Sequence, residues 1–172
     1  MMRMTWRVPV LALAAVCWGT TLAAQEQEEA NRAALARAVL SARVSLERGL
    51  AASASHGQPI SAKFEIEEGK LQLSVYTAKG GRFFEVIVDP NSGKVIKAEP
   101  ITESEDLTAA RSQSAAMAHA TVSLRAALGR AGGANKGYRA VSIYTSLKNG
   151  HPVAAITLVK GEEFKTVSQA LD

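Results

Sequence analysis

The side chains best suited to chemistry in this sequence are three histidines. His56 falls in a predicted loop, His119 on a predicted helix and His151 directly after a predicted hairpin turn. None has a second histidine, a cysteine or a suitably spaced acid nearby in the sequence, so a metal site would need ligands from distant elements. We therefore expect solvated or packed histidines, no metal and no bound cofactor.

Two glutamates form the nearest approach to a catalytic pair. Glu65 and Glu67 share the polar side of one predicted strand, and paired carboxylates can act as general acid and base. The same pattern is typical of the solvated side of a half-buried strand, with Lys63 and Lys70 nearby to balance the charge. No serine lies in a G-x-S-x-G context, and no glycine-rich segment carries the Lys-Ser/Thr of a phosphate loop. We expect no catalytic residue and a protein that is not an enzyme.

Aromatic and aliphatic side chains are more informative. By strand alternation Phe84 points to the core, so Phe83 and Ile87 point outward, and Tyr76 lies on the outer side of its own strand. An exposed apolar patch of this kind indicates an interaction surface. The candidate residues for it are Tyr76, Phe83, Ile87 and Tyr144. Two interpretations stay open: a seam between two halves of the chain or a homodimer, and a surface for a foreign protein or peptide.

The first 24 residues predict a secretory signal peptide. A short basic region precedes an apolar run, residues 8–18, and small residues follow it. The run is too short to span a bilayer, which takes about 20 apolar residues. We expect cleavage after Ala23 or Ala24 and a periplasmic or secreted bacterial protein. The alternatives are an uncleaved anchor and lipid attachment at Cys17, although the residues before that cysteine depart from a lipobox.

Loss of this segment would change the composition of the chain. Its only tryptophans and its only cysteine lie at Trp6, Trp18 and Cys17, so the mature chain would form no disulfide, thiolate metal site or haem attachment. The whole chain carries a formal charge of +4 from 20 basic and 16 acidic residues. Two of the arginines precede the expected cleavage site, which leaves 18 basic and 16 acidic residues and a net charge of +2. That balance argues against nucleic acid or an anionic membrane as the partner.

The two halves of the sequence resemble each other. Val44-Ser-Leu-Glu-Arg-Gly-Leu50 matches Val122-Ser-Leu-Arg-Ala-Ala-Leu128 at a spacing of 78 residues, and residues 79–86 match 160–167 at a spacing of 81. The difference falls in the glycine-rich loop 131–137. Matches in the same order, with one insertion in a loop, indicate an internal duplication, and chance similarity is the alternative.

Each half predicts a helix followed by strands. An apolar stripe predicts a helix from Gln27 to Ala52, and alternation then predicts three strands and a short fourth over Lys94–Ala98. A second stripe, through Met117, Ala120, Leu124 and Leu128, predicts a helix that ends at Gly132-Gly133. Thr102 and Glu105 could form a capping box before it. Two strands joined by Asn149-Gly150 and a weaker last strand follow.

These elements predict an α+β protein built from two helix-plus-antiparallel-sheet units of three to four strands each. The first unit covers residues 27–98, the second and shorter unit covers 107–172, and residues 99–106 form an acidic linker.

The segment Arg82–Val95 resembles the PepSY family. An aromatic-containing strand leads there into a D-x-x-x-G turn, Asp89 to Gly93, before a last strand. The second half lacks that turn, so it resembles the family only through the internal repeat. The resemblance implies an exported α+β protein with a binding or inhibitory role, because PepSY domains occur in propeptides of secreted metalloproteases and in periplasmic proteins. No catalytic residue belongs to the family pattern.

We therefore predict a non-catalytic periplasmic module that binds or inhibits a protein partner, such as a protease. The alternatives are a chaperone-like accessory factor for a secreted hydrolase and a carrier of a small molecule or metal.

Overall fold

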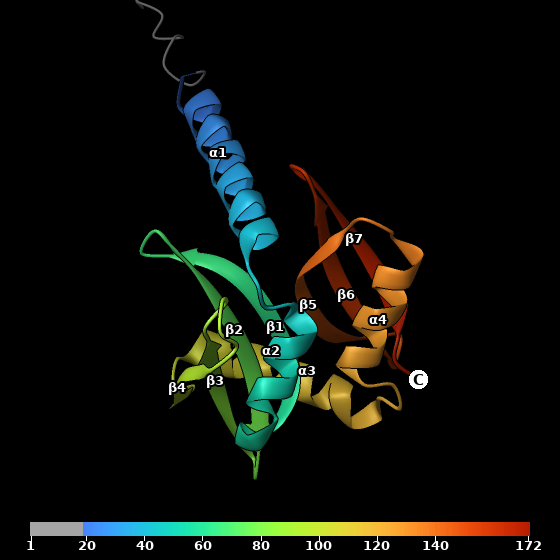
Figure 1. Cartoon of the computed structure of the whole chain (residues 1–172). Coiled ribbons are helices and arrows are strands. Elements are labelled where there is room, and N and C mark those ends of the chain that lie inside the picture. Colours follow the sequence, from blue (N-terminus) through green and yellow to red (C-terminus); the bar gives the residue numbers. More distant parts are fainter. Residues whose placement is uncertain (1–18) are drawn as a thin grey trace, which may run out of the picture. The chain divides into compact units, whose positions relative to one another are not determined.

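The strands of both halves join in one antiparallel sheet of seven strands (Figure 1). The computed structural model describes residues 19–172, and within them the strand order is β4-β3-β2-β1-β5-β6-β7. The strands are β1 Gln58–Glu67, β2 Lys70–Lys79, β3 Arg82–Val88, β4 Val95–Pro100, β5 Arg139–Lys148, β6 His151–Lys160 and β7 Glu163–Ala170. The helices are α1 Gly19–Ser41, α2 Leu46–Ser53, a 3-10 turn Ala54–His56, α3 Ser104–His119 and α4 Leu124–Ala134. The α+β class is confirmed.

The sheet, the helices that cover it and the end of α1 belong to one compact unit, Arg32–Asp172. Most of the predicted signal segment, including Cys17, lies outside the described residues. The expected cleavage positions Ala23 and Ala24 lie within α1. Among the described residues, no helix is both long and apolar enough to cross a membrane.

The prediction of one continuous helix from Gln27 to Ala52 was wrong. The backbone leaves the helix after Ser41, and the Val44 N–H donates to the carbonyl of Pro90 at 3.0 Å instead of to its own helix. Ser45 then starts α2, its hydroxyl accepting from the backbone N–H of Arg48. A serine N-cap satisfies a helix donor that would otherwise have no partner, which favours a new helix at this point.

The second predicted helix is also divided in two. The backbone N–H groups of Thr121 and Val122 donate to the carbonyl of Leu171 at 2.7 and 2.8 Å, and Ser123 caps α4 by accepting from the Ala126 N–H. The apolar stripe therefore ran across a break between α3 and α4. Both breaks fall in the repeated Val-Ser-Leu sequence, where the serine is the N-cap.

The acidic segment between the halves is shorter than predicted. Glu99 and Pro100 belong to β4, where they pair with β3, and α3 already begins at Ser104. The predicted capping box was wrong as well, because the N-cap is Glu103 and no side chain accepts a capping hydrogen bond there. Only residues 101–103 connect strand and helix.

The predicted hairpin turns are confirmed. Glu68 and Gly69 between β1 and β2 have φ values of 49° and 75°, and Asn149 and Gly150 between β5 and β6 have 53° and 82°. Positive φ at both central residues is the signature of the tight turn whose twist matches that of antiparallel strands. These turns set the register of both hairpins.

One face of the sheet carries the main core. It is covered by α2 and α4, which contact each other and the strands of the first and second half respectively (Figure 1). Gly49 of α2 approaches β2 so closely that a Cβ there would lie 2.5 Å from the Leu73 side chain. The fully buried side chains of this core include Leu46, Leu50, Ile60, Leu73, Leu128, Ile143, Ile156 and Leu158.

The opposite face of the sheet is partly covered by α3. This helix contacts β5, β6, β1 and β2, and in Figure 1 it passes behind the sheet, on the side away from α2. Gln113 of α3 accepts a hydrogen bond of 2.7 Å from the hydroxyl of Ser61 on β1. The part of this face that α3 leaves exposed is therefore bounded by the helix on the side of β1.

The D-x-x-x-G turn connects the sheet to the first helix break. The Asp89 carboxylate accepts from the N–H groups of Asn91 and Ser92 at 3.1 and 2.6 Å, and Gly93 has a φ of 74°. Pro90 in this turn accepts from Val44. In the second half the position at the same spacing of 81 residues is Leu171, which accepts from Thr121 and Val122.

Candidate functional site

The sheet face opposite the main core bears charged and aromatic side chains between β1 and β4. We call this surface the polar face; its residues are Lys63, Glu65, Gln72, Ser74, Tyr76, Glu85, Ile87, Lys97 and Glu99. Strand register aligns them in transverse rows, because directly opposed residues of neighbouring strands point to the same side. One row runs Glu99–Glu85–Tyr76–Ser61–Tyr144, and the next runs Lys97–Ile87–Ser74–Lys63.

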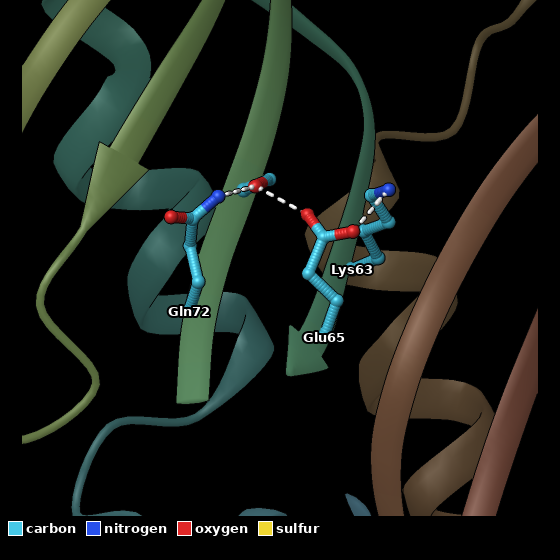
Figure 2. A network of polar contacts seen from close by, with 4 residues as sticks. Lys63, Glu65 and Gln72 are labelled. Atoms are coloured by element: carbon cyan, nitrogen blue, oxygen red, sulfur yellow. Dashed lines mark hydrogen bonds and ion pairs between the residues drawn. The ribbon is translucent and has the colours of Figure 1, made fainter. Parts of the chain in front are cut away.

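A chain of hydrogen bonds organises the centre of the polar face (Figure 2). The Lys63 ammonium lies 2.5 Å from one oxygen of Glu65, and Ser74 donates to the other oxygen at 2.8 Å. Gln72 donates in turn to the Ser74 hydroxyl at 3.0 Å. Ser74 is fully buried, so this bond also satisfies a hydroxyl that has lost its water. Both oxygens of Glu65 are therefore engaged by neighbours.

Two tyrosines flank Lys63 beneath α3. Tyr76, Tyr144 and Lys63 line a small pocket of about 190 Å³ together with residues of α3, among them Asp106 and Gln113. The Lys63 ammonium lies 5.9 Å from the centre of the Tyr76 ring, at the outer limit of a cation–π contact. The two tyrosine rings and the Lys63 ammonium therefore line the same pocket on the sheet.

The ionisation of this group is shifted by its surroundings. Burial alone would lower the pKa of Lys63, but the hydrogen bond and Coulombic attraction of Glu65 raise it above its usual value. Burial, followed by the nearby charges of Glu85 and Glu65, holds the pKa of Tyr76 far above that of a free tyrosine. Burial also raises the pKa of Tyr144, against an opposing effect of Lys63. At neutral pH the site thus presents two phenol groups and an ammonium.

A wider groove opens from this pocket toward the β4 edge of the sheet. It has a volume of about 490 Å³ and shares Lys63 and Tyr76 with the pocket. Its walls combine carboxylates, two lysines and the apolar side chains Ile87 and Ile96, the second of which is 65% exposed. Lys97 pairs with Glu99 at 2.7 Å on this surface. We call this hollow the polar-face groove.

The structure brings together part of the surface predicted from the aromatic residues. Tyr76 and Tyr144 lie in one row across β2, β1 and β5, and both line the pocket under α3. Ile87 lines the polar-face groove. Phe83 shares the face but lies at the start of β3, where it packs partly against the core and lines neither hollow.

The two halves meet along β1 and β5, through the register pairs Ser61–Tyr144, Ala62–Ile143 and Lys63–Ser142. Tyr144 therefore lies at this junction and Tyr76 one strand away from it. Phe83 and Ile87 lie on β3, two strands from β1.

The histidines do not gather. His151 lies 2.6 Å from the carboxylate of Asp172, which lowers the pKa of that carboxyl, and the backbone carbonyl of His56 faces the Thr77 hydroxyl. His119 ends α3. Among the described residues, no group of three or more His, Cys, Asp or Glu side chains is placed to hold a metal ion. Glu65 and Glu67 line one groove. Glu67, however, is exposed and takes no part in the hydrogen-bonded network around Glu65.

A separate hollow, of about 410 Å³, is formed where the end of α2 meets the connection between α3 and α4. Its floor is apolar, with Leu50, Met117 and Leu124 all buried, and Gln58 and Arg125 stand among its polar lining residues. We call it the apolar pocket.

Several residues of the polar face gave no signal of their role in the sequence. Ser74 and Gln72 read as ordinary solvated positions of a strand, yet they hold Glu65 in place. Asp106 and Gln113 reach the site because α3 crosses the sheet. Alternation did predict that Lys63 and Glu65 share a face, but nothing in the sequence shows which strand lies beside β1 on its other side.

Comparisons with known proteins add little to this geometry. No protein-family model and no curated protein matches the chain significantly. A solved structure named as a "putative lipoprotein" from Clostridium difficile 630 aligns with a TM-score of 0.41 and 15% sequence identity. The alignment covers 66% of this chain and 75% of that one.

Proposed function

We propose that this protein is an exported, non-catalytic module that binds a segment of a partner protein on its polar face. The observation that carries the proposal is the polar-face groove of about 490 Å³. The main core occupies one face of the sheet, and α3 packs over β1, β2, β5 and β6 of the other. The part of that face on β3 and β4 offers apolar and charged groups to a partner.

Binding fits this surface better than catalysis does. A general base needs a free lone pair directed at its substrate. Glu65, the carboxylate of the hydrogen-bonded network, has one oxygen engaged by Lys63 and the other by Ser74. A hydrogen-bonded network of this kind holds side chains in fixed positions, which reduces the entropy that a binding surface loses on association.

The proposal includes two PepSY-like copies, the second degenerate, and an inhibitory role toward a secreted protease. Three parallels between the halves support the duplication. Each half has a Val-Ser-Leu helix break with a serine N-cap, a β-hairpin with positive φ at both turn residues, and a carbonyl, of Pro90 or Leu171, that accepts from that break. The D-x-x-x-G turn of the first copy supplies the first of these carbonyls.

The binding proposal is tested by selecting peptides from a random library against the purified protein and measuring affinities by calorimetry. We expect Ile87→Ala to weaken the selected peptides several-fold, because it removes apolar surface from the wall of the groove. The matched control is Val153→Ala, on β6 and outside the groove. Equal affinity of the Ile87 variant and the unaltered protein would refute binding at this surface.

The partner class needs a separate experiment. The protein is added to purified secreted proteases of the bacterium that encodes it, and both their activity and their refolding yield are measured. We expect reduced activity at stoichiometric concentrations. A higher refolding yield with unchanged activity would instead favour a chaperone-like accessory factor, and no effect on either would contradict both roles.

Export is tested by expressing the full chain in a bacterium and determining the N-terminus of the protein recovered from the periplasm. We expect a mature chain that starts near Gln25. Recovery of the uncut chain from the cytoplasm would contradict export.

The apolar pocket favours a second candidate function, a carrier of a small apolar molecule. Its volume of about 410 Å³ lies in the range of ligand pockets, and its floor is buried and apolar. We expect the dye 1-anilinonaphthalene-8-sulfonate to bind, and Ala54→Trp to block it by filling the pocket. Ala126→Trp, an exposed alanine of α4 outside the pocket, is the control. Equal dye binding by both variants would argue against a carrier.

A further inference from the structure

The chemistry of the polar-face groove identifies the kind of segment it takes. We propose that the groove binds an extended basic segment of the partner protein, with a Lys or Arg side chain seated beside Tyr76 and against Glu85. This inference rests on the proposed function and specifies its ligand. It follows from the charges, the aromatic wall and the shape of the groove.

The groove carries an excess of negative charge. Four glutamates line it, Glu65, Glu67, Glu85 and Glu99, against two lysines. Each lysine already pairs with a glutamate, Lys63 with Glu65 and Lys97 with Glu99.

Two carboxylates of the groove are thus left for a partner. No salt bridge within the described part of the chain joins Glu67 or Glu85 to a basic side chain. Asp106 adds a further carboxylate in the adjoining pocket. An incoming cation would therefore meet carboxylates whose charge is not yet compensated, which is the condition for electrostatic complementarity.

Tyr76 supplies an aromatic wall for that cation. It lies directly opposite Glu85 across β2 and β3, so the ring and the carboxylate are neighbours on the same side of the sheet. The Lys63 ammonium, which pairs with Glu65, lies 5.9 Å from the centre of this ring, at the outer limit of a cation–π contact. The same site thus shows, within the protein itself, the kind of group that the groove accommodates.

The apolar parts of the groove suit the stems of basic side chains. Ile87 and Ile96 line the groove beside the carboxylates, Ile87 half-buried and Ile96 exposed. Lys and Arg side chains bury their methylene stems on such surface while their charged heads reach polar groups. The shallow hollow across several strands accommodates an extended chain, and an acidic ligand such as a nucleic acid would be repelled.

The test uses fluorescence anisotropy with the protein purified after expression of the full chain. Three labelled ten-residue peptides alternate valine with lysine, glutamine or glutamate. We expect the lysine peptide to bind at least tenfold more tightly than the glutamine peptide and the glutamate peptide not to bind. We also expect the lysine peptide to weaken several-fold between 50 and 300 mM NaCl, since salt screens charges at a surface.

A matched pair of variants localises the binding. Glu85→Gln keeps the shape of the side chain and removes its charge, and we expect it to weaken the lysine peptide about threefold to tenfold. Glu68→Gln changes an exposed glutamate in the β1–β2 turn, outside the groove, and should leave the affinity unchanged. Circular dichroism checks that both variants are folded.

The outcomes separate the inference from the proposed function. Equal affinity for the lysine and glutamine peptides, or equal effects of the two variants, would overturn the basic ligand but leave peptide binding intact. If neither these peptides nor a selected library peptide bound, both proposals would fail together.

Discussion

At the scale of residues, the polar face is defined by side chains that satisfy one another. Ser74 is fully buried, yet it donates to Glu65 and accepts from Gln72. A buried hydroxyl without such partners would cost stability, so the network is a structural requirement of the sheet as well as a binding surface. Alternation predicted the outward side of each strand, but it did not predict that these positions would be enclosed.

Tyrosine ionisation provides a test of this enclosure. The chain has three tyrosines, and the pKa of each is raised: by burial first at Tyr76 and Tyr144, and by the hydrogen bond to Glu163 first at Tyr138. A raised folded-state pKa favours the protonated form, so this stabilisation is complete below pH 10 or so and is lost as the pH rises further. We expect less tyrosinate absorbance at 295 nm near pH 10 from the folded protein than from the unfolded chain, because all three pKa values are raised on folding.

The unfolded chain in guanidinium chloride is the control for this titration, and its tyrosines should ionise near pH 10. A full equivalent of tyrosinate at that pH, with native circular dichroism, would show that at least one tyrosine is more solvated than the structure indicates.

The Asp89 turn gives a second prediction, with the opposite dependence on pH. Hydrogen bonds from Ser92 and Asn91 lower the pKa of Asp89, so its contribution is present above the unfolded value of about 4 and is lost as the pH falls. Asp89→Ala should cost roughly 1 kcal/mol in urea unfolding at pH 7. The difference from the unaltered protein should shrink at pH 3.

Asp89→Asn is the matched variant, because it keeps an acceptor oxygen but cannot titrate. Neither side chain titrates in these two variants. The difference between their free energies of unfolding should therefore be the same at pH 7 and pH 3. A difference between Asp89→Ala and the unaltered protein that stayed constant from pH 7 to pH 3 would contradict the role of the charge.

At the scale of elements, the helices show where a local pattern misleads. An apolar stripe at helical spacing continues across both breaks, because Ala42 and Val44 are buried at the first and Ala120 and Val122 pack partly against the core at the second. The backbone nevertheless leaves the helix at both places, since a carbonyl from a distant turn accepts the N–H groups there. The Ser N-caps were a usable local signal for these breaks.

Two glycines in helices should respond oppositely to the same substitution. Gly49→Ala would place a Cβ 2.5 Å from the buried Leu73 side chain, so we expect a loss of about 1 kcal/mol or more despite better helix propensity. Gly129→Ala in α4 meets no atom within 4 Å and should gain about 0.5–1 kcal/mol. Urea unfolding measures both, and shifts of the midpoint in the same direction would contradict the close approach of α2 to β2.

At the scale of the whole molecule, the sheet joins two halves that repeat in sequence. The buried side chains of both form one continuous core, and β1 pairs with β5. Thr145 of β5 also donates to the carbonyl of Ile60 on β1 at 2.9 Å. A shared core and shared strand pairing should make the halves unfold together.

Hydrogen exchange tests this coupling. We expect amides in the middle of β2 and of β6 to exchange with the same opening free energy, equal to that of global unfolding by urea. Thr145→Val should lower both equally, by about 1 kcal/mol, because it removes a hydrogen bond across the junction. Unequal protection of β2 and β6, or two urea transitions, would show that the halves are separate cooperative units.

The sequence by itself determined the strands, their inward residues and their turns. These depend on alternation and on positive φ at Gly69 and Gly150, which act within a few residues along the chain. It also determined that Tyr76 and Ile87 leave the core on the same side as Lys63 and Glu65.

Only the tertiary structure decided what that side would face. The joining of β1 to β5 and the passage of α3 across the sheet bring Tyr144 and Asp106 to Tyr76 and leave the polar-face groove beside them. Such contacts arise between residues far apart in the sequence and are selected by the burial of the whole core. No local pattern encodes them, which is why the chemistry of the site became visible only in the folded chain.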